Sequence, residues 1–195
     1  MPPVADLARQ HADHVLGRDG AVVGRVLSEG HGVQVVAYAD VPRDAVHCIT
    51  IGLSDLPVAA LHPSELVCSV RPEQVEAARF LLASVVRVAV ERDGELGLGA
   101  VIANATPLLA GTAICGVLLT SGLQFEDFDD LDLVDGPDGG IALQVLSVVP
   151  LTGGDLARYR AYGRDSLEDA LDVATVDLLD ITRGDLGEGP PTVDG

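Results

Sequence analysis

The sequence predicts an α+β domain, an α/β sandwich in which helices cover a mixed, mainly antiparallel sheet. Short apolar segments rich in Val and Ile and bounded by Gly or Pro recur along the chain, which is typical of strands. Longer segments with apolar residues at helical spacing stand at the start, in the middle and near the end. The order of helix, strands, helix, strands and helices lacks the regular alternation of a parallel βαβ sheet.

Two helices are indicated by their ends as well as by their spacing. Residues 4–17 place apolar side chains near helical spacing, and Gly17 closes the segment. Residues 71–94 carry a wide apolar stripe, as a helix packed on a sheet needs. Pro72 stands in the first turn of this helix, and Glu73 follows at the positive end of the helix dipole.

The remaining elements follow from turn signals and capping residues. The expected strands are residues 21–29, 33–42, 45–54, 64–70, 112–122 and 140–151. The last two are apolar and β-branched, so we expect them at the centre of the sheet, whereas residues 94–111 predict a loop. Thr152, with Asp155 three residues later, predicts a helix N-cap. Two short helices, 154–163 and 166–181, should follow.

The length of 195 residues suits a single domain, which we expect at residues 1–183, with a mobile acidic tail at 184–195. Cys48, Cys68 and Cys115 lie far apart without CxxC spacing, so a disulfide framework is not expected. The N-terminus has neither the basic nor the apolar region of a signal peptide. Charged or polar residues interrupt the apolar segments before about 18 positions, so we expect no membrane span and a cytoplasmic protein.

Composition and charge exclude several classes of function. All twelve basic residues are Arg, so the chain has no lysine for a Schiff base or a phosphate-binding P-loop. Residues 1–120 carry 13 acids against 8 Arg, a net −5, and residues 121–195 carry 17 against 4, a net −13. Such acidity repels phosphate backbones, so we expect no nucleic-acid partner. It favours a basic protein partner, unless it serves solubility alone.

Seven carboxylates and no basic residue lie within residues 122–140. Loops that begin at Asp127 or Asp130 lack the oxygen ligand at position 5 and the Gly at position 6 of an EF-hand. Asp130, Asp132 and Val134 fit the DxDxV pattern of aspartate-nucleophile phosphohydrolases, but no buried apolar strand precedes them. A solvated hairpin and a partner-binding surface remain as hypotheses. The acids assigned to that surface are Glu126, Asp127, Asp129, Asp130 and Asp132.

No catalytic residue, metal ligand or cofactor site emerges elsewhere. His11 and His14 are three apart on a helix, but no third zinc ligand is placed beside them by a motif. His47 and Cys48 are neighbours in a strand, so they point to opposite faces and cannot form a dyad. Residues 94–99 contain a GxG pattern, but it follows a helix rather than the strand that a dinucleotide-binding loop follows.

Five short motifs occur in a characteristic order: a TxGxS segment with a following Pro, an EL pair, a GxLL strand, a PLT segment and a Leu–Gly–Leu ending. Their positions are Thr50, Gly52, Ser54, Pro57, Glu65, Leu66, Gly116, Leu118, Leu119, Pro150, Leu151, Thr152, Leu156, Gly163 and Leu167. In this order the chain, over roughly residues 5 to 183, resembles the suppressor-of-fused domain family.

The resemblance implies a single α/β sandwich domain that binds proteins without catalysis, and in which the motif residues are mainly structural. Eukaryotic members of the family sequester a transcription factor, and many bacterial members look like immunity proteins that neutralise a toxin. A toxin that attacks nucleic acid would be basic, which would suit the acidic half of this chain. A cytoplasmic scaffold for a self protein is the alternative, and a metal-dependent phosphohydrolase using Asp130 and Asp132 is a third hypothesis.

Overall fold

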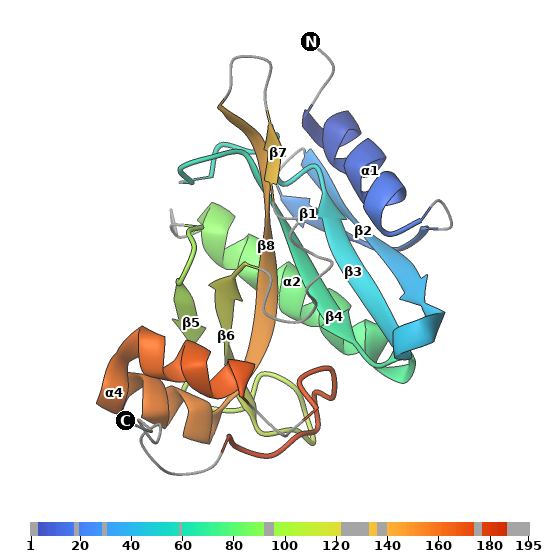
Figure 1. Ribbon diagram of the computed structural model, residues 1–195. Helices are drawn as coiled ribbons and strands as arrows, with labels where there is room; N and C mark the ends of the chain where they lie inside the picture. The colour runs from blue at the N-terminus through green and yellow to red at the C-terminus, as the bar shows by residue number, and fades with distance from the viewer. Residues whose placement is uncertain are drawn as a thin grey trace.

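The computed structural model describes residues 4–17, 20–28, 31–58, 60–91, 96–121, 133–135, 140–173 and 177–186. The helices of these ranges are α1 (Val4–Val15), α2 (Val75–Glu91) and α4 (Gly153–Asp172), with 3₁₀ turns at Val41–Arg43 and Pro72–Gln74. The strands are β1 (Ala21–Ser28), β2 (His31–Asp40), β3 (Ala45–Ile51), β4 (Ser64–Val70), β5 (Val101–Ala103), β6 (Ile114–Thr120), β7 (Leu133–Asp135) and β8 (Ile141–Thr152). The predicted α+β class is confirmed (Figure 1).

The strands form one sheet in the order β1-β2-β3-β4-β8-β6-β5, and β7 pairs with β8 outside this path. The β4–β8 pair is parallel, and all the other pairs of the described strands are antiparallel. β8 joins the two halves of the sheet, because one of its edges pairs with β4 and the other with β7 and then β6. The predicted mixed, mainly antiparallel sheet and the central place of its last strand are therefore confirmed (Figure 1).

Helices cover both faces of this sheet, because successive strand residues point to opposite sides. The apolar stripe of α2 packs on one face, against side chains of β2, β3, β4, β6 and β8. α1 packs on the other face, where Ala8 and Ala12 lie against Val36, Tyr38 and Ile49. α4 covers the β6 and β8 end of the sheet with a third apolar cluster (Figure 1). None of the described helices is both long and apolar enough to cross a membrane.

Three features differ from the sequence-based prediction. Residues 94–111 were predicted to be a loop, but they contain the short strand β5, which pairs with β6. Residues 133–135, within the acidic stretch, form β7. The last helix is predicted to reach residue 181, but α4 ends at Asp172, and the turns at 177–186 are held by side chains distant in sequence. The predicted break between two helices appears as a kink at Gly163, where φ is 84°.

Candidate functional site

Glu65 of β4 is fully buried and surrounded by hydrogen-bond donors. Its Oε1 accepts from the Gly52 N–H at 2.8 Å and from the N–H and hydroxyl of Ser54 at 3.2 and 2.7 Å. Its Oε2 accepts from the Thr50 hydroxyl at 2.7 Å and from the Leu53 N–H at 3.2 Å. The TxGxS segment and the EL pair, which are separate in the sequence, therefore meet at one carboxylate.

These contacts fix the turn at residues 52–56, which follows β3. Backbone pairing of β3 with β4 stops one residue before Thr50, whose hydroxyl oxygen accepts from the Leu66 N–H at 2.8 Å. Gly52 has a φ of 102°, which a residue with a Cβ adopts only with strain. Side-chain oxygens thus replace the missing backbone partners, and Glu65 holds the turn in place.

The environment of Glu65 acts on its charge in two directions. Burial raises the pKa of this carboxyl, and hydrogen bonds donated by Thr50, Ser54 and Gly52 oppose that increase. A buried carboxyl contributes little net stability of its own, since desolvation offsets its hydrogen bonds. Its main effect is to specify where the donors lie.

A second group of motif residues fastens the C-terminal segment to α4. The Thr152 hydroxyl accepts from the Asp155 N–H at 3.2 Å, and the Asp155 carboxylate accepts from the Thr152 N–H at 2.9 Å. The N-cap predicted here is present as a full capping box. Asp155 also pairs with Arg183, whose Nη2 lies 2.6 Å from Asp155 Oδ2 and donates to the Pro150 carbonyl at 2.9 Å.

The other motif residues pack or line turns. A Cβ on Gly116 would lie 2.6 Å from the backbone oxygen of Ile102, so β5 and β6 approach each other at this glycine. Leu66 and Leu151 are fully buried, whereas Pro57 is exposed just after the turn that Glu65 holds.

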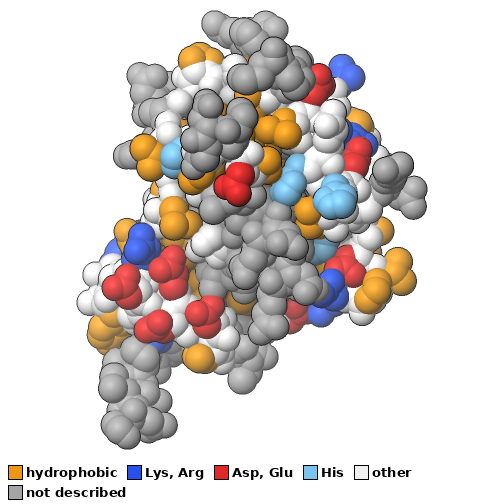
Figure 2. Space-filling model, turned by 45° about the horizontal axis from the view of Figure 1, so that its top comes forward, with side chains coloured by type: hydrophobic (Ala, Val, Ile, Leu, Met, Phe, Trp, Pro, Cys, Tyr) orange, Lys and Arg blue, Asp and Glu red, His pale blue; other side chains and the backbone are white. Residues whose placement is uncertain are grey.

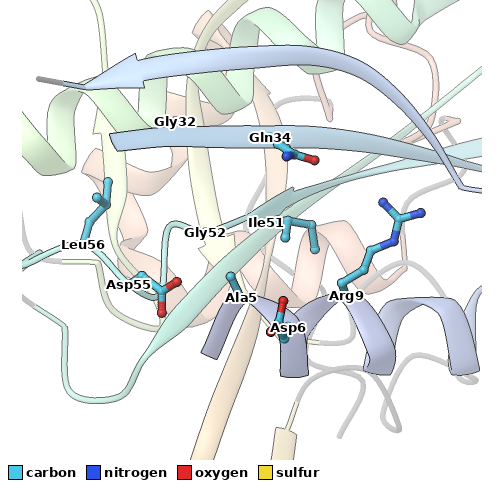
Figure 3. Close-up of a pocket in the computed structure, with 9 residues that line it drawn as sticks. All are labelled: Ala5, Asp6, Arg9, Gly32, Gln34, Ile51, Gly52, Asp55 and Leu56. Carbon is cyan, nitrogen blue, oxygen red and sulfur yellow. The ribbon is translucent and has the colours of Figure 1, made fainter. Parts of the chain in front are cut away.

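The turn held by Glu65 forms one wall of a cavity of about 460 Å³ (Figure 3). Asp55 and Leu56 line it from the turn, and Asp6 lines it from the first turn of α1. Among the described residues, the start of β2 and the end of β3 supply the rest of the lining. Cavities of a few hundred Å³ are usual for ligand sites. Sequence reasoning missed this one, because its walls come from three segments that only the fold brings together.

A smaller cavity of about 240 Å³ lies beside Asp40 and His47. The Nδ1 of His47 lies 2.9 Å from the Ser69 hydroxyl, and its Nε2 lies 3.4 Å from the Asp40 carboxylate. Burial lowers the pKa of His47. Ser69 is only 3% exposed, so this Ser–His–Asp series offers no accessible nucleophile. Within the described residues, no three His, Cys, Asp or Glu side chains are grouped to hold a metal ion.

Acidic side chains also gather on α4, where Figure 2 shows them close together. The acids that the sequence assigns to a partner surface, Glu126, Asp127, Asp129, Asp130 and Asp132, lie outside the described residues. The acids of the C-terminal half of α4 are Asp165, Glu168, Asp169 and Asp172. Their i, i+3, i+4, i+7 spacing places them on one helical face. That spacing is visible in the sequence, although the prediction centred on the denser run before β8.

The fold and the site define a class of α+β domain in which helices cover both faces of one mixed sheet and a buried glutamate fixes a turn beside a cavity. The family model of the suppressor of fused protein (SUFU) matches residues 29–184, and the chain belongs to this family. A comparison with curated proteins finds no match.

Solved structures of similar fold agree with this assignment. A putative SUFU homologue from Neisseria gonorrhoeae superposes with a TM-score of 0.69 at 15% identity, over 95% of this chain and 97% of that one. A chain of the Sufu–Fu complex gives 0.66 at 14% identity, over 95% and 93%. Drosophila Suppressor of Fused gives 0.63 at 15% identity, over 91% of this chain and 50% of that one. At these identities the likeness is one of fold.

Proposed function

We propose that this protein is a non-catalytic protein-binding domain that acts as an immunity protein and neutralises a basic toxin. The observation that carries the binding role is the SUFU family match over residues 29–184. One structure of similar fold was solved as the Sufu–Fu complex, in which a member of this fold binds another protein. Family likeness alone does not specify a partner, so we infer the chemistry of the partner from the charge of this chain.

The distribution of charge supports a basic partner. Residues 121–195 carry 17 acids against 4 Arg. On α4, Asp169 and Asp172 are exposed on the same face as Asp165, which is 91% exposed on its side chain. An acidic surface of this kind accelerates the encounter with a basic protein, because the summed field steers the approach. A toxin that acts on nucleic acid needs a basic surface for its own substrate, so an acidic inhibitor can cover that surface.

Growth rescue separates this proposal from the alternative, a scaffold that binds a self protein. The protein encoded beside this gene should arrest growth when it is expressed alone, and co-expression of this chain should restore growth. A partner that is harmless when expressed alone would instead favour the scaffold. Binding is then measured with the two purified proteins.

Neutralising the acidic stretch tests which surface the partner uses. Changing Glu126→Gln, Asp127→Asn, Asp129→Asn, Asp130→Asn and Asp132→Asn should leave the fold intact and slow association about tenfold at low salt. The difference should shrink toward about 0.5 M salt, where screening removes steering. A control variant neutralises three exposed acids elsewhere, Asp44, Glu73 and Glu76, and should associate at nearly the parent rate. Equal on-rates for all three proteins at low salt would remove the acidic stretch from the binding surface.

The non-catalytic part of the proposal is tested with metal ions. Purified protein should bind no stoichiometric Mg²⁺, Ca²⁺ or Zn²⁺ and should not hydrolyse a phosphate monoester. Stoichiometric metal that is lost in Asp130→Asn would favour the phosphohydrolase instead.

A further inference from the structure

The cavity beside α1 holds two carboxylates that form no ion pair or hydrogen bond with the described residues. Asp6 lines it from α1 and Asp55 from the turn after β3 (Figure 3). The described ion pairs and side-chain hydrogen bonds include neither of them. Both are exposed residues at the edge of the cavity, with no counter-ion from the described part of the chain.

The arginine in the lining does not neutralise them. Arg9 Nε lies 3.0 Å from Asp13 Oδ1, and Arg9 Nη2 donates to the Gly20 carbonyl at 3.1 Å. Its guanidinium lies 5.9 Å from the centre of the Tyr38 ring, and the Tyr38 hydroxyl donates to the same Asp13 oxygen at 2.6 Å. Arg9 is therefore already balanced by Asp13, and the described lining residues keep a net negative charge.

The rest of the lining matches a long side chain with an apolar stem. Ala5, Ile51 and Leu56 supply apolar contacts, and Gln34 adds an amide that makes no hydrogen bond with the described residues. Gln34 continues the row of Val36 along the α1 face of β2, so its amide reaches the cavity from the sheet (Figure 3). Lys and Arg bury their methylenes on apolar surface and present the charge at the tip.

We infer that this cavity takes one basic side chain, an arginine or a lysine, with its charged group between Asp6 and Asp55. We expect arginine rather than lysine, because its planar guanidinium presents several donors in a fixed arrangement that matches carboxylate oxygens. Glu65 fixes the turn that carries Asp55, so the acceptor on this side is held in place before the ligand arrives. The source of the side chain rests on the proposed function, since a basic partner protein would supply it.

The inference can be tested on the full chain without a partner. The probe is N-acetylargininamide, titrated into ¹⁵N-labelled protein, with N-acetylcitrullinamide as the neutral analogue of the same shape. We expect saturable shifts of the backbone amides of Gly32, Gln34, Gly52 and Asp55 with the arginine probe and not with the citrulline probe. The double variant Asp6→Asn/Asp55→Asn should weaken probe binding about tenfold.

A matched control removes two carboxylates from another surface. Asp44→Asn/Glu73→Gln, at exposed positions outside the cavity lining and outside α4, has the same net charge as the cavity variant and should bind the probe within about twofold of the parent. The inference is overturned if both double variants lose binding equally, if the citrulline probe binds as well, or if the shifts spread over the acidic surface. None of these results would affect the proposed function, which growth rescue decides separately.

Discussion

Glu65→Gln removes one of the two acceptor oxygens at the centre of the family motif while keeping the size of the side chain. The amide oxygen of the glutamine will take the position of Oε1, because Gly52 and Ser54 supply three hydrogen-bond donors there. The amide nitrogen then faces Thr50 and Leu53. The Thr50 hydroxyl can turn toward the Leu66 carbonyl, which lies 3.5 Å away, and accept from the new amide.

The Leu53 N–H would lose its hydrogen-bond acceptor, because an amide nitrogen cannot accept a hydrogen bond. One orphaned buried N–H costs about 1–3 kcal/mol, and the facing amide hydrogens add to that. We therefore expect a loss of about 2–4 kcal/mol in unfolding free energy, or roughly 4–16 °C in Tm for a chain of this size. Urea unfolding measures the loss, with the exposed Glu73→Gln as a control that should cost less than about 0.5 kcal/mol.

The pH dependence of this loss has a definite sign. Because burial raises the folded pKa of Glu65 above its ordinary value of 4.5, its contribution to stability is fully present below that value. The contribution declines as pH rises through the folded pKa, and the variant has no such decline. The destabilisation should therefore be larger near about pH 4 than near about pH 8. If Glu65→Gln unfolded at the same urea concentration as the control Glu73→Gln at both pH values, the idea that Glu65 organises the turn would be refuted.

Three further predictions concern packing, thiols and the buried histidine. Gly116→Val should cost at least about 1–3 kcal/mol, since its Cβ meets the Ile102 backbone oxygen, which cannot rotate away. Parent-like melting would mean that β5 does not approach β6 there. Burial raises the pKa of the Cys48 thiol to about 12 and raises that of Cys68 as well, so in the native protein a thiol reagent should modify Cys115 first. Rapid modification of all three without denaturant would contradict the buried placement. Because burial lowers the pKa of His47 from 6.5, stability should fall as pH drops below that value, and His47→Gln should flatten this fall in urea unfolding curves. An unchanged slope in the variant would assign the acid sensitivity to other groups.

Elements with local signals were predictable from the sequence. The end of α1 follows from Gly17, which has a φ of 98° in the structure. The start of α4 follows from Thr152 and Asp155, because a capping box lies within four consecutive residues. Apolar, β-branched segments between turn residues placed the longer strands correctly, since each is buried over most of its length.

Features that depend on distant contacts were not predictable in this way. β5 is only three residues long and exists through its pairing with β6. Residues 166–181 have an apolar pattern that favours helix, but Arg71 binds Asp177 at 2.6 Å and Gln74 binds Asp180 at 2.7 Å. These contacts across more than a hundred residues override the local preference.

Glu65 is a residue from which the sequence predicts more than secondary structure. An acid inside an otherwise apolar strand must find partners when it is buried, so the sequence signals a polar network at this position. It does not identify the donors, because they lie at the end of β3 and in the turn after it, while Glu65 lies in β4. The cavity is hidden for the same reason, since Asp6 and Asp55 become neighbours only when α1 packs on the sheet.

The hydrogen bonds around Glu65 serve to fix the position of the turn after β3 more than to stabilise the fold. An apolar residue of similar volume often serves a core equally well in energy. It could not accept hydrogen bonds from the N–H groups of Gly52, Leu53 and Ser54, which buried backbone must satisfy somewhere. Those groups would turn toward water, and Asp55, the next residue, would move with them. A carboxylate at the base of the turn therefore determines where Asp55 stands, and the turn and the cavity beside it form one arrangement.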